Sequence, residues 1–298
     1  MLVYGTELLK HASENNYAVP AFNFANMEGL QAIIEGAEEL KSPVFIQTTQ
    51  GAIDYAGFEY LADIGIGAAK RAAVPIALHL DHGQKYEYNL KAIRLGWTSL
   101  MMDASHDDFE TNVVKVNQVL NVARPLGISV EAELGVVGGK EDDIESDESI
   151  FTNVNDAVDF YEKTKCNSLA IAVGTAHGIY KGEVRIDFNR IREIKEVLPI
   201  PLVLHGSSGV PNDMVTEAVR CGINKVNFDT ELKLANLNAL KKFISNNPEV
   251  YDIRKIYKPC KKEMKEIVRE KIIACLSDNQ SWTNCGKVFN GDQLLNVK

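Results

Sequence analysis

The stretch "PIALHLDHG", residues 75–83, changes character from its start to its end. It begins as an apolar run that suits a buried strand, and it ends in two titratable residues, Asp81 and His82. Such a segment is either a core strand that carries a hydrogen-bonded histidine or one edge of an active site. The choice depends on where the other strands of the chain end.

Short apolar runs rich in β-branched residues recur along the chain, and each precedes a segment with a helical period. In the helical segment at residues 26–41, apolar residues recur at i, i+3, i+4 and i+7. Continuous apolar strands that alternate with helices indicate parallel strands covered on their outer face. Eight such units in 298 residues predict an α/β fold, a (β/α)₈ TIM barrel, with strands near residues 18–24, 43–49, 75–81, 99–105, 129–135, 168–174, 201–206 and 225–231.

Two helices and a tail frame the predicted barrel. A first helix precedes the first strand, and residues 249–276 predict an extra C-terminal helix after the eighth unit. No linker rich in Pro, Gly or Ser divides the first 275 residues, so we expect one barrel domain over residues 1–276. Residues 277–298 have no strong period, and we expect them to form a C-terminal tail of unassigned role.

The composition excludes several classes of protein. No run of about 18 apolar residues exists, and no basic region followed by an apolar stretch marks a secretory signal. The five cysteines are odd in number and lack CxxC spacing, which argues against a disulfide framework or a cysteine zinc site. We therefore expect a cytoplasmic protein.

The net charge of −9, without a basic cluster interleaved with aromatics, disfavours nucleic acid and anionic membranes as partners. An anionic small molecule can still bind, provided that backbone amides and a few cations form a local site.

Polar residues end six of the predicted strands. The chemistry of a TIM barrel takes place at the carboxyl ends of its strands. The residues at these ends are Asp81, His82, Asp103, Ser105, His106, Glu133, His177, His205, Asn227, Asp229 and Thr230. Their shared position favours an active site over a core strand.

Three histidines at one rim can hold a catalytic zinc ion. His82, His177 and His205 would supply three nitrogen ligands and leave a fourth position open for water or substrate. A lone histidine at a strand end is more often structural, but three at one rim favour a metal site. We do not expect His11 or His106 to be ligands.

Asp103 and Glu133 are carboxylates at the same rim. They either orient the ligating histidines, as outer carboxylates generally do at metal sites, or form a second, alternative metal position. The sequence leaves both readings open.

Asp81 immediately precedes His82, and adjacent side chains on an extended strand point apart. The turn at the strand end can nevertheless bring both to the mouth, where an aspartate beside a bound substrate can act as general acid or base. The competing role is an N-cap for the following helix, and the nearby histidines favour catalysis. We expect His79 to alternate away from Asp81 and to be structural.

Glycine-rich loops follow the last strands. "HGSSGVP" (205–211) and "NFDTE" (227–231) supply amides and hydroxyls that lead into helices after strands seven and eight, where barrels most often bind phosphate. Gly178 and Lys181 lie near the same edge. This arrangement predicts a phosphorylated metabolite as ligand.

The loop at residues 135–153 has a Gly-Gly hinge near its start, at residues 138–139, and carries many acids. It is either an ordinary solvated loop or a mobile lid that bears a catalytic carboxylate.

Seven motifs together resemble those of the class II ketose-bisphosphate aldolases, in the same order and across residues 1–276. They are "YAVPAFNFANME", "LHLDHG", "MMDASH", "SVEAELGVVGGKEDD", "GTAHGIYKGE", "PLVLHGSSGVP" and "KVNFDTELK". The fructose- and tagatose-bisphosphate aldolases are the most similar members. The resemblance implies a lyase of carbohydrate metabolism, including glycolysis, that reversibly cleaves a ketose 1,6-bisphosphate into dihydroxyacetone phosphate and glyceraldehyde 3-phosphate.

The resemblance also implies a role for each site residue. The three histidines would hold Zn²⁺, Asp103 and Glu133 would match the alternative metal position, and a second divalent ion and a monovalent cation are compatible with the family. Asp81 would move the proton on the C4 hydroxyl, and Glu141 would exchange the proton on the dihydroxyacetone-phosphate carbon. The loops and the resemblance together give these substrate-binding residues: Asn23, Thr49, Gly178, Lys181, Gly206, Ser207, Ser208, Asn227, Phe228, Asp229 and Thr230.

Arg254 would match an arginine that reaches the distal phosphate across a subunit boundary, so the resemblance implies a homodimer or homotetramer. Cleavage between C3 and C4 leaves an enediolate that needs an electrophile at the C2 oxygen, and zinc can serve as that Lewis acid. No Schiff-base lysine is evident in the sixth strand, "SLAIAVG".

Two departures from the family's pattern bear on specificity. Lys140 precedes Glu141 where many relatives carry an acid, and the motifs combine tagatose-like and fructose-like features. The preferred C4 epimer therefore stays open.

Three alternatives stay in view. A metal-dependent hydrolase on the same barrel would commonly place an HxH pair on the first strand, which here reads "AFNFA". An aldolase for another phosphorylated ketose would use the same residues. A non-catalytic phosphosugar-binding protein would more readily have lost Asp81 or a histidine, and all four remain.

Overall fold

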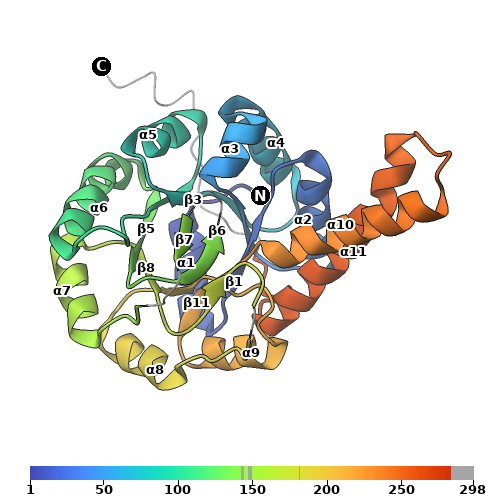
Figure 1. Ribbon diagram of the computed structural model, residues 1–298. Coiled ribbons are helices and arrows are strands. Elements are labelled where there is room, and N and C mark those ends of the chain that lie inside the picture. Colours follow the sequence, from blue (N-terminus) through green and yellow to red (C-terminus); the bar gives the residue numbers. More distant parts are fainter. Residues whose placement is uncertain (142–143, 147–149, 181, 283–298) are drawn as a thin grey trace, which may run out of the picture.

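Eight parallel strands close into one barrel in the computed structural model (Figure 1), which describes residues 1–141, 144–146, 150–180 and 182–282. The strands neighbour one another in the order β1-β11-β10-β8-β5-β4-β3-β2. They are β1 (Val19–Asn23), β2 (Val44–Thr48), β3 (Ile76–Gly83), β4 (Ser99–Met102), β5 (Ser129–Leu134), β8 (Ser168–Ile171), β10 (Leu202–Leu204) and β11 (Ile223–Phe228). All eight predicted strands and the TIM-barrel fold are confirmed.

Helices surround the barrel as an outer layer (Figure 1). They are α2 (Met27–Glu39), α3 (Gln50–Ala56), α4 (Phe58–Arg71), α5 (Tyr86–Leu95), α6 (Phe109–Ala123), α7 (Val154–Thr164), α8 (Phe188–Val197), α9 (Asn212–Arg220), α10 (Thr230–Asn246) and α11 (Ile253–Ala274), with a short 3₁₀ helix at Arg124–Leu126. No helix in the described part of the chain is long and apolar enough to cross a membrane.

Alternation along each strand creates two apolar layers. Outward-facing residues such as Phe22, Ile46 and Leu78 pack beneath the helices in the large core, where their side chains are fully buried. A smaller cluster lies at the end of the barrel where the strands begin. There α1 (Gly5–Asn15) packs Leu8 and other apolar residues against Phe45, so this helix closes the barrel from below.

A small second sheet lies at the mouth. The strands β6 (Gly138–Glu141), β7 (Ile144–Ser146) and β9 (Ala176–His177) pair in the order β7-β6-β9. Part of the loop at residues 135–153 is thus strand, which we did not predict, because its short polar segments lack the apolar alternation of a core strand. Gly139 has φ 96° and lies opposite His177, where a Cβ atom would collide with the His177 backbone, so this position requires glycine.

Helices α10 and α11 form an antiparallel arm that projects from the barrel (Figure 1). Helix α11 confirms the predicted C-terminal helix and continues through Pro259. Ion pairs join α11 to α2, with Lys261 Nζ 2.7 Å from Glu35 Oε1 and Lys265 Nζ 3.1 Å from Glu39 Oε2.

The first residues of the predicted tail pack on the barrel. Ser277 Oγ lies 2.7 Å from Ser42 Oγ, and the Trp282 ring stacks on His11 with the ring centroids 4.1 Å apart. The rest of the predicted tail, residues 283–298, lies outside the described residues.

Candidate active site

The end of β3 turns Asp81 and His82 toward the same mouth. His82 has φ 47°, a left-handed conformation that is uncommon for a residue other than glycine. The register between β3 and β4 shifts between Leu80 and Gly83. This local irregularity lets two adjacent residues point into one site, which a regular strand cannot do.

Asp81 is fully buried and accepts hydrogen bonds from three amide side chains. Its Oδ2 lies 2.8 Å from Asn23 Nδ2 and 3.0 Å from Gln47 Nε2, and its Oδ1 lies 3.1 Å from Asn227 Nδ2. The N-cap role is excluded, because α5 begins at Tyr86 and its N-cap is Lys85. These three donors hold the Asp81 carboxylate in one orientation.

His82, His177 and His205 come together at the mouth, as predicted. The ring centroid of His82 lies 5.2 Å from that of His177 and 4.7 Å from that of His205. Each histidine offers a nitrogen, and the three nitrogens lie within 4.8 Å of one another. His177 reaches this position on β9, where its pairing with Gly139 fixes its backbone.

Asp103 orients His82. The Oδ2 atom of Asp103 accepts a hydrogen bond of 2.7 Å from His82 Nδ1, and its Oδ1 accepts from the backbone N and the hydroxyl of Ser105. Burial opposes ionisation of Asp103, but the hydrogen bond and charge of His82, together with the Ser105 donors, hold the pKa of this carboxyl well below its usual range. The structure thus supports the orienting role for Asp103.

Glu131 orients His205 from below. Its Oε1 accepts a hydrogen bond of 2.7 Å from His205 Nε2, and its Oε2 lies 2.9 Å from Lys225 Nζ. Burial opposes its ionisation, but Lys225 and His205 lower the pKa of Glu131 far below its usual value. Burial in turn lowers the pKa of His205, despite the opposing effect of Glu131, so the neutral imidazole is favoured.

His79 corrects one expectation. We expected it to alternate away from Asp81, but residues two apart on a strand share a face. Its ring is fully buried inside the barrel, where Nδ1 lies 2.8 Å from Ser99 Oγ and Nε2 lies 3.9 Å from Glu131 Oε2. His79 is structural, as expected, but it lies beneath Asp81 in the same interior.

The residues present fit a divalent metal ion. Since the carboxylates of Asp103 and Glu131 accept the N–H of His82 Nδ1 and of His205 Nε2, the lone pairs lie on His82 Nε2 and His205 Nδ1. These two atoms face each other 2.9 Å apart, an arrangement that a bound cation stabilises. Three imidazoles, of which His82 and His205 have a carboxylate partner at the second ring nitrogen, form a donor set typical of zinc.

A second set of possible ligands overlaps the first. His82, Asp103 and Glu133 each offer an atom within 4.8 Å of the others, and Glu133 Oε2 lies 3.7 Å from His205 Nδ1. The alternative metal position is therefore geometrically available, while Asp103 also orients His82.

The predicted phosphate loops line a polar cavity of about 80 Å³ beside the histidines. The sequence-predicted residues around it are Asn23, His177, Gly178, Gly206, Ser207, Ser208, Asn227, Asp229 and Thr230, and Lys233 joins them. Gly206 has φ 63° and packs so closely that a Cβ would lie 2.7 Å from the Ala176 backbone. Tyr180 joins these loops, because its hydroxyl accepts from Ala176 N and donates to the Gly206 carbonyl, both at 2.8 Å.

Other predicted residues lie elsewhere. The side chain of Phe228 is fully buried in the outer core, 5.7 Å from Phe22 between ring centroids, because it alternates with inward-facing Asn227. Any contact of Phe228 with substrate must come from its backbone. Thr49 caps α3 and lines an adjoining cavity with Asn23.

Arg254 lies on the projecting arm, where its side chain is 88% exposed and pairs with Asp252. The backbone of Glu141 ends β6, but its side chain, and the whole of Lys181, lie outside the described part of the structure.

Sequence reasoning missed Gln47, Glu131 and Lys225, which complete the interior network. Each lies two positions before a polar strand-end residue: Thr49, Glu133 and Asn227 respectively. The period of two along a strand places both members of each pair on the interior face. That spacing was the signal that could have identified them.

A parallel barrel with a histidine-carboxylate cluster and a polar cavity at its mouth is typical of the TIM-barrel enzymes, and comparisons with known proteins agree with this class. The family model described as "Fructose-bisphosphate aldolase class-II" matches residues 3–280. A fructose-bisphosphate aldolase of Thermus caldophilus is 42% identical over an alignment of 297 residues, gaps included, and the match covers 91% of this chain and 97% of that protein.

Solved structures give the same result. The YdjI aldolase from Escherichia coli K12 has a TM-score of 0.85 and 34% identity, with 95% of this chain and 100% of that chain covered. A putative fructose-1,6-bisphosphate aldolase from Coccidioides immitis has a TM-score of 0.84 and 30% identity, with 93% and 97% covered. The chain belongs to the class II fructose-bisphosphate aldolase family, a family of lyases.

Proposed function

We propose that the protein reversibly cleaves fructose 1,6-bisphosphate into dihydroxyacetone phosphate and glyceraldehyde 3-phosphate. The observation that carries this proposal is the placement of Asp81 beside three histidines and next to the polar cavity of the Gly206 loop. The name of the Thermus caldophilus relative favours the fructose sugar over its C4 epimer, tagatose 1,6-bisphosphate.

We assign His82, His177 and His205 as the ligands of the catalytic metal, which we propose is Zn²⁺. When bound, the ion supplies a Lewis acid for the oxygen at C2 of the sugar. Asp103 and Glu131 fix the tautomers of His82 and His205, and so keep their lone pairs directed into the site. Glu133 is available for the alternative position.

Asp81 is the proposed acid/base for the C4 hydroxyl. In the cleavage direction it takes the hydroxyl proton while the C3–C4 bond breaks, so that C4 becomes the aldehyde carbon and the electron pair stays on C3. Asn23, Gln47 and Asn227 hold the carboxylate in one orientation for this transfer. In the synthetic direction the same group returns the proton.

The loops at the mouth of the barrel suggest roles for the remaining predicted residues. The cavity lined by Gly178, Gly206, Ser207, Ser208 and Thr230 would bind the phosphate of the triose half through amides and hydroxyls. Asn23 and Thr49 extend from it toward the other half of the sugar, where a second cavity of about 140 Å³ adjoins it. We assign the proton exchange at C3 to Glu141, because it follows the Gly-Gly segment paired with His177.

We further propose a cytoplasmic homo-oligomer whose barrel domain, residues 1–276, binds substrate jointly with a second copy. Arg254 projects on the α10–α11 arm rather than into the mouth (Figure 1), which suits a role in the site of a neighbouring subunit. Mixing inactive Asp81→Ala and Arg254→Ala chains should then restore part of the activity, since mixed oligomers contain one site with both residues intact. Mixtures that stay inactive would assign Arg254 elsewhere.

The test of the substrate is a side-by-side assay of initial rates with fructose 1,6-bisphosphate and tagatose 1,6-bisphosphate, with both triose phosphates measured as products. We expect cleavage of both C4 epimers to be detectable and cleavage of the fructose epimer to be faster. A faster tagatose reaction would reverse the epimer assignment. No cleavage of either sugar would favour an aldolase for another phosphorylated ketose.

A further inference from the structure

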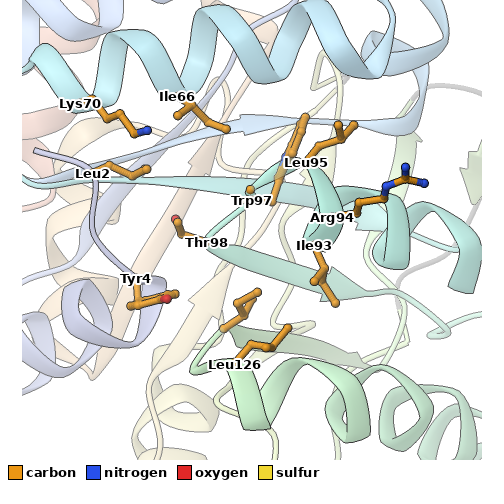
Figure 2. Close-up of a pocket in the computed structure, with 12 residues that line it drawn as sticks. Leu2, Tyr4, Ile66, Lys70, Ile93, Arg94, Leu95, Trp97, Thr98 and Leu126 are labelled. Atoms are coloured by element: carbon orange, nitrogen blue, oxygen red, sulfur yellow. The ribbon is translucent and has the colours of Figure 1, made fainter. Parts of the chain in front are cut away.

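A third cavity, of about 240 Å³, lies far from the mouth (Figure 2). Its lining includes Trp97 and Thr98, which precede β4, and Ile128, which precedes β5. Leu2, another lining residue, pairs with Ile76 at the start of β3. Because parallel strands all begin at one end of a barrel, the cavity lies at the end opposite the candidate active site.

The walls of this cavity are mainly apolar. Figure 2 shows Ile66 extending from α4 on one side and Leu126 on the opposite side, with Leu2 and Trp97 between them. Trp97 is 1% exposed, and its ring packs edge-on against Phe58, 5.7 Å between centroids, so this wall is firmly held. An apolar cavity of about 150 Å³ binds benzene in another protein, so the volume here suits an aromatic ring with a short chain.

The charged groups of the cavity are both cations. Lys70 extends from α4 and Arg94 from the end of α5, and both are exposed. Neither forms an ion pair with a residue in the described ranges, and no acid is among the described residues that line the cavity. Figure 2 shows Lys70 and Arg94 on opposite sides of the cavity. In a chain of net charge −9, these two cations make the surroundings of the cavity locally favourable for an anion.

We propose that this cavity binds a small amphipathic monoanion, an aromatic or alkyl carboxylate. Its apolar part would lie against Ile66 and Trp97, and its carboxylate would meet Lys70, which lies beside Ile66 on the same helix. A neutral ligand would lack the charge that the cations attract. A sugar phosphate lacks the apolar part, so this ligand class differs from the phosphosugar proposed for the mouth of the barrel. The inference goes beyond the proposed function and does not depend on it.

The tryptophans allow a direct test. The chain has two, Trp97 and Trp282, so in the Trp282→Phe protein the fluorescence reports Trp97 alone. The probe is 3-phenylpropionate, and its matched neutral analogue is 3-phenylpropionamide. We expect the acid to change the Trp97 emission in a saturable way and to bind about tenfold more tightly than the amide, because it alone pairs with Lys70.

A matched pair of double variants distinguishes the effect of the cations at the cavity from the effect of the net charge of the protein. Lys70→Gln/Arg94→Gln should remove the preference for the acid, while Lys241→Gln/Arg220→Gln, which removes the same charges from exposed positions elsewhere, should keep it. Aldolase activity should be unchanged in both, so a failure of this proposal is distinguishable from a failure of the proposed function.

Three results would overturn the proposal. The first is an unchanged emission with the acid up to millimolar concentration. The second is equal binding of acid and amide, or undiminished binding by Lys70→Gln/Arg94→Gln. The third is a response that occurs only while light scattering shows an oligomer dissociating, which would assign the cavity to a second copy of the chain.

Discussion

The two ends of the barrel are built from the same eight strands but differ in their side chains: one end is apolar and the other is polar. At the end where the strands begin, α1 packs Leu8 and its apolar neighbours against Phe45 and Ala77. At the end where they finish, Asp81 and the three histidines face one another with carboxylates and amides behind them. The contrast shows that residues at the start of a strand can stabilise the fold while residues at the end of the same strand form the candidate active site, as is usual in this fold.

The sharpest test of this division is Asp81→Ala. Removing a general acid/base should lower the rate of ketose-bisphosphate cleavage about 10²- to 10⁴-fold, while the unfolding midpoint and the bound metal change little. Initial rates, thermal unfolding and metal analysis check these three quantities. Asp63→Ala, on the exposed face of α4, is the control and should keep full activity; an equally active Asp81→Ala protein would remove Asp81 from the mechanism.

The ion pair in the barrel interior should contribute both to stability and to metal binding, and the Lys225→Met substitution tests the first of these. The substitution leaves Glu131 buried without its cation, and breaking a buried ion pair costs about 3–5 kcal/mol of stability. Urea unfolding measures this loss.

The double variant Lys225→Met/Glu131→Gln should recover part of the stability, since no uncompensated charge remains. It should still bind zinc more weakly than the parent in a chelator competition, because the hydrogen bond that fixes His205 is weakened. A single variant as stable as the parent would show that the pair is not the source of interior stability.

Leu8→Ala tests the closed end. Deleting a fully buried leucine side chain should lower the free energy of unfolding by about 2–5 kcal/mol. The rate of cleavage per folded molecule should not change, because α1 lies at the other end of the barrel. Leu237→Ala, at an exposed position of α10, is the matched control and should cost much less. A large loss of turnover in folded Leu8→Ala protein would contradict the separation of the two ends.

The dependence of stability on pH should also come from the interior. Burial and the charge of Lys225 hold the pKa of His79 well below its ordinary value, so the folded protein keeps this ring neutral. The unfolded chain takes up a proton there once the pH falls below about 6.5. The unfolded state then binds more protons, so stability decreases as the pH falls through that range.

Urea unfolding of chelator-treated protein between about pH 8 and pH 5 measures this slope. His79→Gln should make the slope shallower, because one of the buried neutral imidazoles is gone. An unchanged slope would indicate that His79 does not contribute. Asp103 and Glu131, whose pKa values are lowered, should add a second loss of stability at more acidic pH, where these carboxyl groups take up protons.

The two ends of the barrel also differ in how much of their structure could be predicted from the sequence. The apolar runs and the helical segments between them were sufficient to predict the barrel, because the spacing of apolar residues along a strand or helix can be read from neighbouring residues alone. The rim residues Asp81, His82, His177 and His205 were predictable because strand ends can be located from composition. The left-handed turn at His82 was not, because only packing determines that conformation, and the network of Glu131 and Lys225 depends on pairings between distant strands.

The small sheet at the mouth shows the same limit. Gly138 and Gly139 looked like a loop hinge, yet they pair with Ala176 and His177, far along the chain. Likewise, Phe228 lies within a motif that we predicted to bind substrate, but its side chain points into the core, since neighbours on a strand face opposite ways.

The most direct test of the central claim is the initial rate of fructose 1,6-bisphosphate cleavage before chelation, after chelation and after return of Zn²⁺. We predict that cleavage disappears with the chelator and returns with zinc, because we assign His82, His177 and His205 as the ligands of the metal on which the rate depends. Cleavage that persists undiminished in the metal-free protein would contradict that claim.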